Sequence, residues 1–148
     1  MNDRFRFRVW FTPDYQEPEM IYDTEQTYDF GCQSKGSYYH DNFGEILEDK
    51  DCIVMQCTGL KDKNGKLIYE GDILQSEEYP FKNEKGYNYA AEVLWDDASA
   101  TFYYYTFRIS NNVVGRSTGN TGELNEYEDW EVIGNIYENK ELLEVNNG

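Results

Sequence analysis

Strict alternation of apolar and polar residues is the feature that most constrains how this chain can fold. Residues 4–11 read RFRFRVWF, in which three phenylalanines and Val9 fall on one face of an extended segment, and three arginines and Trp10 on the other. Because successive side chains of a strand point to opposite faces, this period predicts a strand with one buried side. Residues 101–109, TFYYYTFRI, repeat the alternation with aromatic residues. We therefore expect an all-β or β-dominated fold.

A hairpin is predicted where the apolar run CIVMQCTGL is followed by Asn64-Gly65. Both residues of this pair tolerate the positive φ that a two-residue type I′ turn requires. Such a turn would place Lys63 opposite Lys66, which is mildly unfavourable, so a longer loop is the alternative. Gly71 then precedes the start of the next predicted strand.

The rest of the chain divides into short predicted elements. Residues 13–50 are the least regular, with a short strand near Met20–Tyr22 and a helical turn near Glu45–Leu47. Further strands are predicted at 89–95, with Ala91, Val93 and Trp95 on one face, at 101–109 and at 130–137, and Asn139 is expected to cap a short helix. Residues 77–88 and 110–129 are predicted to be loops.

The spacing of these strands predicts a small barrel or sandwich from Asp51 onward. The length of 148 residues suits one domain with a small appendage. We therefore expect residues 1–50 to form an N-terminal β segment with irregular loops, and residues 51–148 to form the barrel with a short C-terminal helix.

The net charge of −16, from 29 acidic and 13 basic residues, limits the partners of the chain. Binding to duplex DNA depends on lysines and arginines that release counterions from phosphates, so this balance argues against direct nucleic-acid binding. A basic partner, or simple solubility, is consistent with the charge. An acidic decoy that imitates DNA would further require carboxylates arrayed on one face.

The residues that usually carry catalysis or metal binding are scarce. His40 is the one histidine, and Cys32, Cys52 and Cys57 do not have the paired spacing of a zinc site. The segment 60–71 fails the calcium-loop pattern at both ends. A nucleophilic pair of Cys32 or Cys52 with His40 stays open, although inert buried cysteines are commoner. We expect no metal, no cofactor and no catalytic activity.

The N-terminus is charged rather than apolar, so no cleavable signal peptide is predicted. No apolar run approaches the ~18 residues of a membrane span. Few cysteines and no leader are typical of a cytoplasmic protein, and we expect no membrane partner.

Two groups of residues are candidates for partner binding. Arg4, Arg6 and Arg8 would lie together on one face of the first strand, where they could bind an acidic partner or pair with the chain's own carboxylates. On the strand at 101–109, the face of Tyr103, Tyr105 and Phe107 is expected to be core, although such a face could also recognise peptides. The opposite face would then expose Phe102 and Tyr104 as a contact surface or an oligomer interface.

Three segments together carry a resemblance to a known family: RFRVW near the N-terminus, MQCTGLKDKNGKLIYEGDIL at 55–74 and VIGNIYEN at 132–139. In this order they resemble the YopX-like family of phage and prophage proteins. The resemblance implies an N-terminal β segment, a C-terminal SH3-like barrel and a phage or prophage origin in a Gram-positive host, and it implies no established activity. Its structural motif residues would be Gly59, Leu60, Asn64, Gly65, Tyr69, Gly71, Asp72, Gly134 and Asn135.

These observations favour a phage accessory protein that acts as a non-catalytic protein-binding module for a host or phage protein. The alternatives are an acidic DNA-mimic decoy that inhibits a host DNA-binding protein, and an enzyme of unrecognised type. Exposed aromatic strands would also permit a homo-oligomer.

Overall fold

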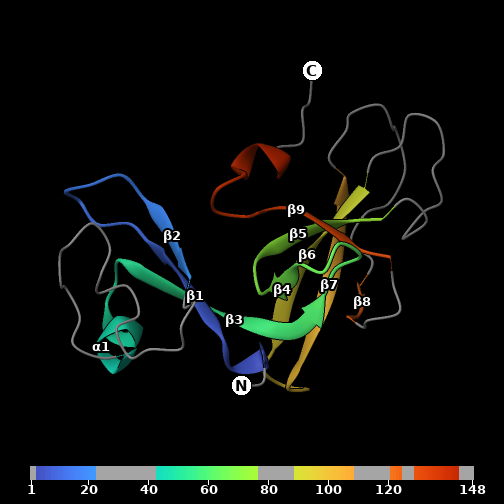
Figure 1. The fold of residues 1–148 in the computed structure, drawn as a ribbon, viewed down its shortest axis with the longest axis horizontal. Coiled ribbons are helices and arrows are strands. Elements are labelled where there is room, and N and C mark those ends of the chain that lie inside the picture. Colours follow the sequence, from blue (N-terminus) through green and yellow to red (C-terminus); the bar gives the residue numbers. More distant parts are fainter. Residues whose placement is uncertain (1–2, 23–42, 77–88, 109–120, 125–128, 144–148) are drawn as a thin grey trace. The chain divides into compact units, whose positions relative to one another are not determined.

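The computed structural model describes residues 3–22, 43–76, 89–108, 121–124 and 129–143. The chain forms two compact units, Met1–Cys57 and Thr58–Gly148. The strand β3, Cys52–Lys61, contributes residues to both (Figure 1). The boundary between the units therefore lies inside a strand, whereas the sequence-based division was placed at residues 50/51.

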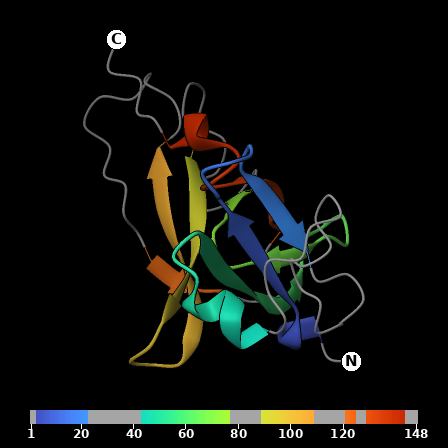
Figure 2. The same cartoon turned by 90° about the vertical axis from the view of Figure 1, so that its left-hand side faces the viewer.

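The first unit contains a small antiparallel sheet. The elements of this unit are η1 (Asp3–Phe5), β1 (Phe7–Phe11), β2 (Glu19–Tyr22), α1 (Phe43–Glu48) and the first part of β3. β1 pairs with β2 on one side and with β3 on the other. Figure 2 shows β1 and β2 running antiparallel. Val9 and Phe11 of β1 form a buried cluster with Ile46 of α1. The predicted short strand near residues 20–22 and the helical turn near residues 45–47 are both confirmed.

The predicted first strand is too long at its N-terminal end. Residues 3–5 form a 3₁₀ turn instead, in which the Arg6 N–H donates to the Asp3 carbonyl at 3.0 Å. Alternation alone could not show this, because a single turn stabilised by one local hydrogen bond leaves the polar–apolar period of the sequence unchanged.

The second unit is built on a five-stranded antiparallel sheet that curls into a half-barrel, so the β-dominated prediction is confirmed. Its strand order is β8-β7-β6-β5-β9. The elements are β4 (Leu67–Tyr69), β5 (Asp72–Gln75), β6 (Tyr89–Asp96), β7 (Thr101–Arg108), β8 (Thr121–Glu123), β9 (Glu131–Asn135) and η3 (Lys140–Leu142). β8 lies within a segment that was predicted to be loop.

The core of the second unit is centred on Trp130, which is 1% exposed. Its ring packs against Tyr104 of β7, with ring centroids 5.3 Å apart. The other buried members of the cluster are Ile68, Leu74, Ala91, Val93 and Leu124, with Leu60, Phe102 and Val132 packed against it. Aliphatic residues from five separate elements thus enclose one aromatic pair.

The expected orientation of β7 is inverted. Tyr104 is 2% exposed and Thr106 is fully buried, whereas Tyr105 is 44% exposed. The face of Tyr103 and Tyr105 therefore points outward. Alternation defined two faces correctly, but both carry aromatic residues, so hydrophobicity could not decide which one meets the core.

The hairpin turn at residues 62–66 is the longer alternative. The Gly65 N–H donates to the Asp62 carbonyl at 3.0 Å, and the Asp62 N–H donates to the Lys66 carbonyl at 2.8 Å. Gly65 has φ of +84°, but Asn64 does not have positive φ. A type I′ turn needs positive φ at both central residues, so the loop is the three-residue kind with glycine in the left-handed position.

The mutation Gly65→Val is expected to lower the free energy of unfolding by about 1–2 kcal/mol, because a β-branched residue is strained at positive φ. A Cβ at Gly65 would meet nothing within 4 Å, so the cost comes from the backbone alone. Lys63→Ala removes one exposed ion pair and should cost at most about 1 kcal/mol. Denaturant unfolding of the two variants measures both values, and equal midpoints would show that the turn is assigned wrongly.

Candidate functional site

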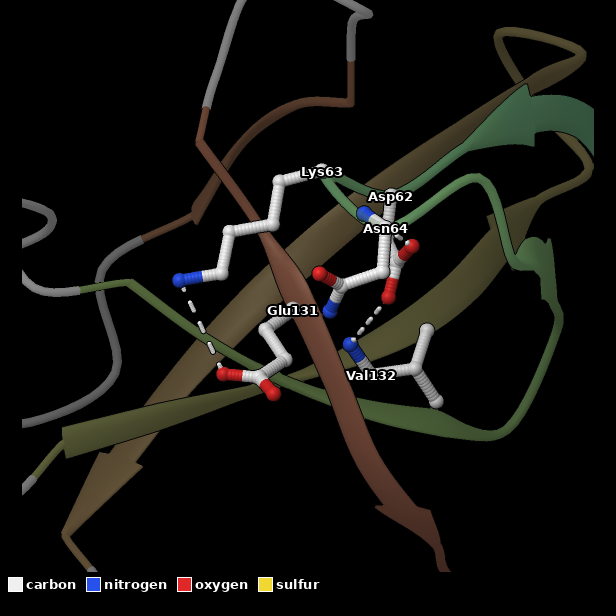
Figure 3. A network of polar contacts seen from close by, with 5 residues as sticks. All are labelled: Asp62, Lys63, Asn64, Glu131 and Val132. Atoms are coloured by element: carbon white, nitrogen blue, oxygen red, sulfur yellow. Dashed lines mark hydrogen bonds and ion pairs between the residues drawn. The ribbon is translucent and has the colours of Figure 1, made fainter.

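The turn at residues 62–66 is joined to β9 by a network of polar contacts (Figure 3). One carboxylate oxygen of Asp62 accepts the N–H groups of Asn64 and Lys66, each at 2.9 Å. The other accepts the Val132 N–H at 3.0 Å. The Lys63 N–H donates to the Trp130 carbonyl at 2.8 Å, and the Lys63 ammonium lies 3.7 Å from Glu131.

This network covers a sheet edge. β9 is the last strand in the order of its sheet, and its Trp130 carbonyl and Val132 N–H would otherwise lack strand partners on that side among the described residues. The Asp62 carboxylate and the Lys63 N–H supply an acceptor and a donor in place of a strand. An edge satisfied in this way is protected from pairing with other chains.

The surroundings of Asp62 also determine its ionisation. Burial by itself would raise the pKa of this carboxyl, but the N–H groups of Val132, Lys66 and Asn64 and the charge of Lys66 outweigh it and hold the pKa below the ordinary 3.8. Asp62 therefore carries its charge at neutral pH. Sequence analysis did not single out this residue as structural, although an aspartate two residues before an Asn-Gly pair is a common turn-forming signal.

The other family-motif residues also occupy structural positions. Asp72 is 2% exposed and accepts the Tyr69 N–H at 2.8 Å. Asn135 uses its side-chain oxygen to accept the N–H groups of Tyr137 and Glu138, at 3.0 and 2.8 Å. Gly59 and Gly71 have positive φ, Leu60 packs on the core, and Gly134 lies in β9. These residues shape strands and turns.

The helix predicted after Asn139 is a single 3₁₀ turn, Lys140–Leu142, with Asn139 at its N-cap position. The Asn139 side chain makes no capping hydrogen bond into this turn. Its oxygen instead accepts the Asn135 N–H at 3.1 Å, so it closes the loop that follows β9.

The three N-terminal arginines do not share one exposed face. Arg4 lies in η1, with its guanidinium 4.8 Å from the centroid of the Phe5 ring. Arg6 forms an ion pair with Asp3 at 3.3 Å, which is the self-pairing alternative. Arg8 is 2% exposed and therefore cannot form part of an exposed stripe.

The second candidate pair is also turned inward. Tyr104 is buried against Trp130, and Phe102 is partly buried against the same cluster. The close approach of β8 fixes this packing, because a Cβ at Gly122 would collide with the Tyr104 ring. The exposed aromatic face of β7 is therefore the one that carries Tyr103 and Tyr105, and not the one of Phe102 and Tyr104.

Cys52 lies in surroundings that keep its thiol protonated. Burial, followed by the charges of Asp49 and Asp51 and a hydrogen bond to Asp49, raises the pKa of Cys52 to about 12. The thiol stays protonated at neutral pH, and only a thiolate is an effective nucleophile. His40 and Cys32 lie outside the described residues. Within the described residues, no cluster of three or more His, Cys, Asp or Glu side chains is placed to hold a metal ion.

An acidic aromatic face is formed by the outward side chains of β6, β7 and β8. We define it as Glu92, Asp96, Tyr103, Tyr105 and Glu123. The strand register aligns these side chains: Glu92 lies opposite Tyr105, and Tyr103 lies between Leu94 of β6 and Glu123 of β8. Each tyrosine thus has an acidic residue opposite it on one neighbouring strand, Glu92 of β6 for Tyr105 and Glu123 of β8 for Tyr103.

A groove of about 670 Å³ crosses one end of this face. It is lined by Asp96, Ser99, Thr101, Tyr103, Thr121, Gly122 and Glu123. Polar and acidic side chains thus surround one tyrosine ring, which is the arrangement that suits a lysine or arginine side chain.

The carboxylates of the acidic aromatic face differ in their ionisation. The Ser99 hydroxyl donates to Asp96 at 2.7 Å and the Ala98 N–H at 3.0 Å, and these contacts lower the pKa of Asp96. Burial raises the pKa of Glu92 above its ordinary 4.5. Asp96 is therefore readily charged, whereas the charge on Glu92 is held at a cost to folding.

The mutation Glu92→Gln is therefore expected to raise the melting temperature at pH 7. Because the folded-state pKa of Glu92 lies above its unfolded value, ionisation of this residue lowers stability as the pH rises through that interval. The gain should vanish below about pH 4, where both states carry a protonated Glu92. Thermal unfolding across this pH range tests it, and a variant that is less stable at pH 7 would contradict it.

The model of the family described as YopX protein matches residues 6–144. Among solved structures, the chain is similar to the crystal structure of protein EF1440 from Enterococcus faecalis, with 28% identity and a TM-score of 0.45, over 94% of this chain and 97% of that one. No curated protein matches. None of the helices in the described residues has the length and apolar character needed to cross a membrane.

Proposed function

We propose a binding function for this chain, which belongs to the YopX family. In this proposal it is a non-catalytic, cytoplasmic phage accessory protein that binds a basic segment of a host or phage protein. The acidic aromatic face on β6, β7 and β8 is the binding surface. The observation that carries this proposal is the outward placement of Tyr103 and Tyr105, each opposite an acidic residue of a neighbouring strand.

The chemistry of this face favours a cationic partner. Tyrosine rings attract lysine and arginine side chains through their negative faces, and a carboxylate within reach adds a charge-assisted hydrogen bond. Tyr105 is 44% exposed and Tyr103 lines the groove, so both rings are accessible to a partner. The overall charge of −16 would speed encounter with a basic protein.

A second exposed aromatic group lies at the end of the same hairpin. Trp95 is 38% exposed, and its indole N–H donates to Asp97 at 2.7 Å. Its ring meets Phe102 edge-on, with centroids 4.8 Å apart. The register places Trp95 opposite Phe102, on the face of Tyr104, so this indole lies outside the acidic aromatic face.

The experiment compares capture of a partner from a lysate of the bacterial host by wild-type protein and by two matched charge reversals. Glu123→Lys changes the acidic aromatic face, whereas Glu17→Lys makes the same change at an exposed residue of the first unit. We expect Glu123→Lys to reduce recovery of the same partner about tenfold or more, because like charges repel across an interface, and Glu17→Lys to leave recovery unchanged. Equal recovery with both variants would contradict the proposal.

The same experiment separates the acidic decoy. A decoy spreads its contacts over many carboxylates at phosphate-like spacing, so both reversals would weaken capture to a similar degree, and duplex DNA would displace the partner. That pattern would replace the proposed site with a general electrostatic surface.

A further inference from the structure

The short strand β8 has one backbone edge that points away from its sheet. β8 is the first strand in the order of the five-stranded sheet, beside β7 (Figure 1). Its register with β7 sets Tyr103 opposite Glu123 and Tyr105 opposite Thr121. The hydrogen bonds between β7 and β8 show which backbone groups of β8 point away from β7 and could pair with another strand.

The hydrogen bond from the Leu124 N–H to the Phe102 carbonyl, at 3.4 Å, identifies residues 102 and 124 as a hydrogen-bonded pair. In an antiparallel ladder, hydrogen-bonded and non-hydrogen-bonded pairs alternate. Gly122 therefore pairs with Tyr104, and the N–H and C=O groups of Thr121 and Glu123 point away from β7. Among the described residues, no backbone group bonds to these outward groups.

The side chains of the same two residues line the groove. Thr121 and Glu123 both border it, and both are exposed. Backbone groups available for pairing and side chains that favour a cation thus belong to the same two residues. A strand placed along this edge would set every second side chain on the outer face, next to Glu123 and within reach of the groove.

We propose that β8 binds its partner by strand addition: an extended segment with lysine or arginine at alternate positions pairs with the outward backbone groups of Thr121 and Glu123. Its basic side chains lie over the groove beside Glu123 and Tyr103. The inference rests on the proposed binding function and adds the backbone conformation of the ligand. Main-chain hydrogen bonds supply affinity in this mode, and alternate side chains supply specificity.

The first test uses a short synthetic peptide of alternating lysine and threonine and measures its binding to the full chain by calorimetry. Two further peptides carry backbone N-methyl groups on all lysines or on all threonines. Because alternate N–H groups of an added strand face β8, one methylated series should lose binding about tenfold or more, and the other should bind like the parent. Equal behaviour of the two methylated series would overturn the strand addition.

The second test changes the protein. Thr121→Pro removes an outward N–H without removing a hydrogen bond to β7, and proline is tolerated in edge strands. Thr121→Val keeps the N–H and is the control. We expect weaker peptide binding with proline only, at unchanged melting temperatures. Peptide binding that survives Thr121→Pro but is lost in Glu123→Lys would support the proposed function and reject the strand addition. If the wild-type protein does not bind the peptide, the strand addition is rejected, and partner capture remains the test of the function.

Discussion

Asp62→Ala is expected to lower the free energy of unfolding by about 2–4 kcal/mol at pH 7, because it removes the acceptor of three backbone N–H groups. The donors at Asn64 and Lys66 hold the turn, and the donor at Val132 belongs to the edge of β9. One side chain thus stabilises a hairpin and covers a sheet edge. Urea unfolding measures the loss, and a change below about 0.5 kcal/mol would show that the network contributes little.

The pH dependence of stability in the Asp62 variants provides a second test of this prediction. The folded-state pKa of Asp62 lies below its unfolded value, so its stabilisation is present above about pH 4 and is lost as the pH falls through the folded pKa. Wild-type protein should therefore approach Asp62→Ala in stability under acid. Asp62→Asn keeps one carbonyl acceptor and should show an intermediate stability at pH 7. A stability difference between wild type and Asp62→Ala that stays constant down to pH 2 would contradict this assignment.

Trp130→Ala is expected to cost about 3–5 kcal/mol, which is the usual range for truncation of a large buried aromatic residue. Trp130 is 1% exposed and packs on Tyr104, and its carbonyl accepts the Lys63 N–H. The substitution opens a cavity at the centre of the half-barrel. Thermal or denaturant unfolding measures the effect. Because folded domains are only marginally stable, we expect the Trp130→Ala variant to be close to unfolding.

Trp95→Ala is the matched control for this prediction. Both tryptophans belong to the second unit, where Trp95 lies in β6 and Trp130 just before β9, but Trp95 is 38% exposed. Its ring contacts Phe102, and its indole N–H donates to Asp97. Its removal should cost about 1 kcal/mol, the value of an edge-on aromatic pair. Comparable losses for the two tryptophans would show that the core is not centred on Trp130.

Much of the fold could be predicted from local patterns. The strands at 52–61, 89–96 and 131–135 follow apolar runs or alternation bounded by turn residues. The helical turn in the segment 43–48 and the short strand at 19–22 were also predicted. Periodicity is informative at these places because one face of each element is clearly more apolar than the other.

Prediction failed where local sequence is ambiguous. Both faces of β7 are aromatic, so only packing against Trp130 decides that Tyr104 lies inside. The three residues of β8 include Gly122, which has poor strand propensity, and pairing with β7 outweighs that propensity. The position of Arg8 depends on burial of a guanidinium group, which alternation with phenylalanine does not reveal.

The candidate site was missed for the same reason. Its residues come from three strands, and β8 is separated from β7 in the sequence by the residues 109–120. Tyr103 and Tyr105 were predicted to be core, so the placement of Tyr105 opposite Glu92 and of Tyr103 opposite Glu123 could be recognised only from strand register. Asp96 and Glu123 had no distinguishing sequence signal in so acidic a chain.

The most direct measurement of the central claim is a map of amide chemical shifts during titration of the full, isotope-labelled chain with the alternating lysine and threonine peptide. The proposal predicts saturable shifts that cluster on Tyr103, Tyr105, Thr121 and Glu123. Shifts that are absent would reject strand addition at β8, and shifts that spread evenly over acidic residues such as Glu17 and Glu48 would contradict a defined binding site on this face.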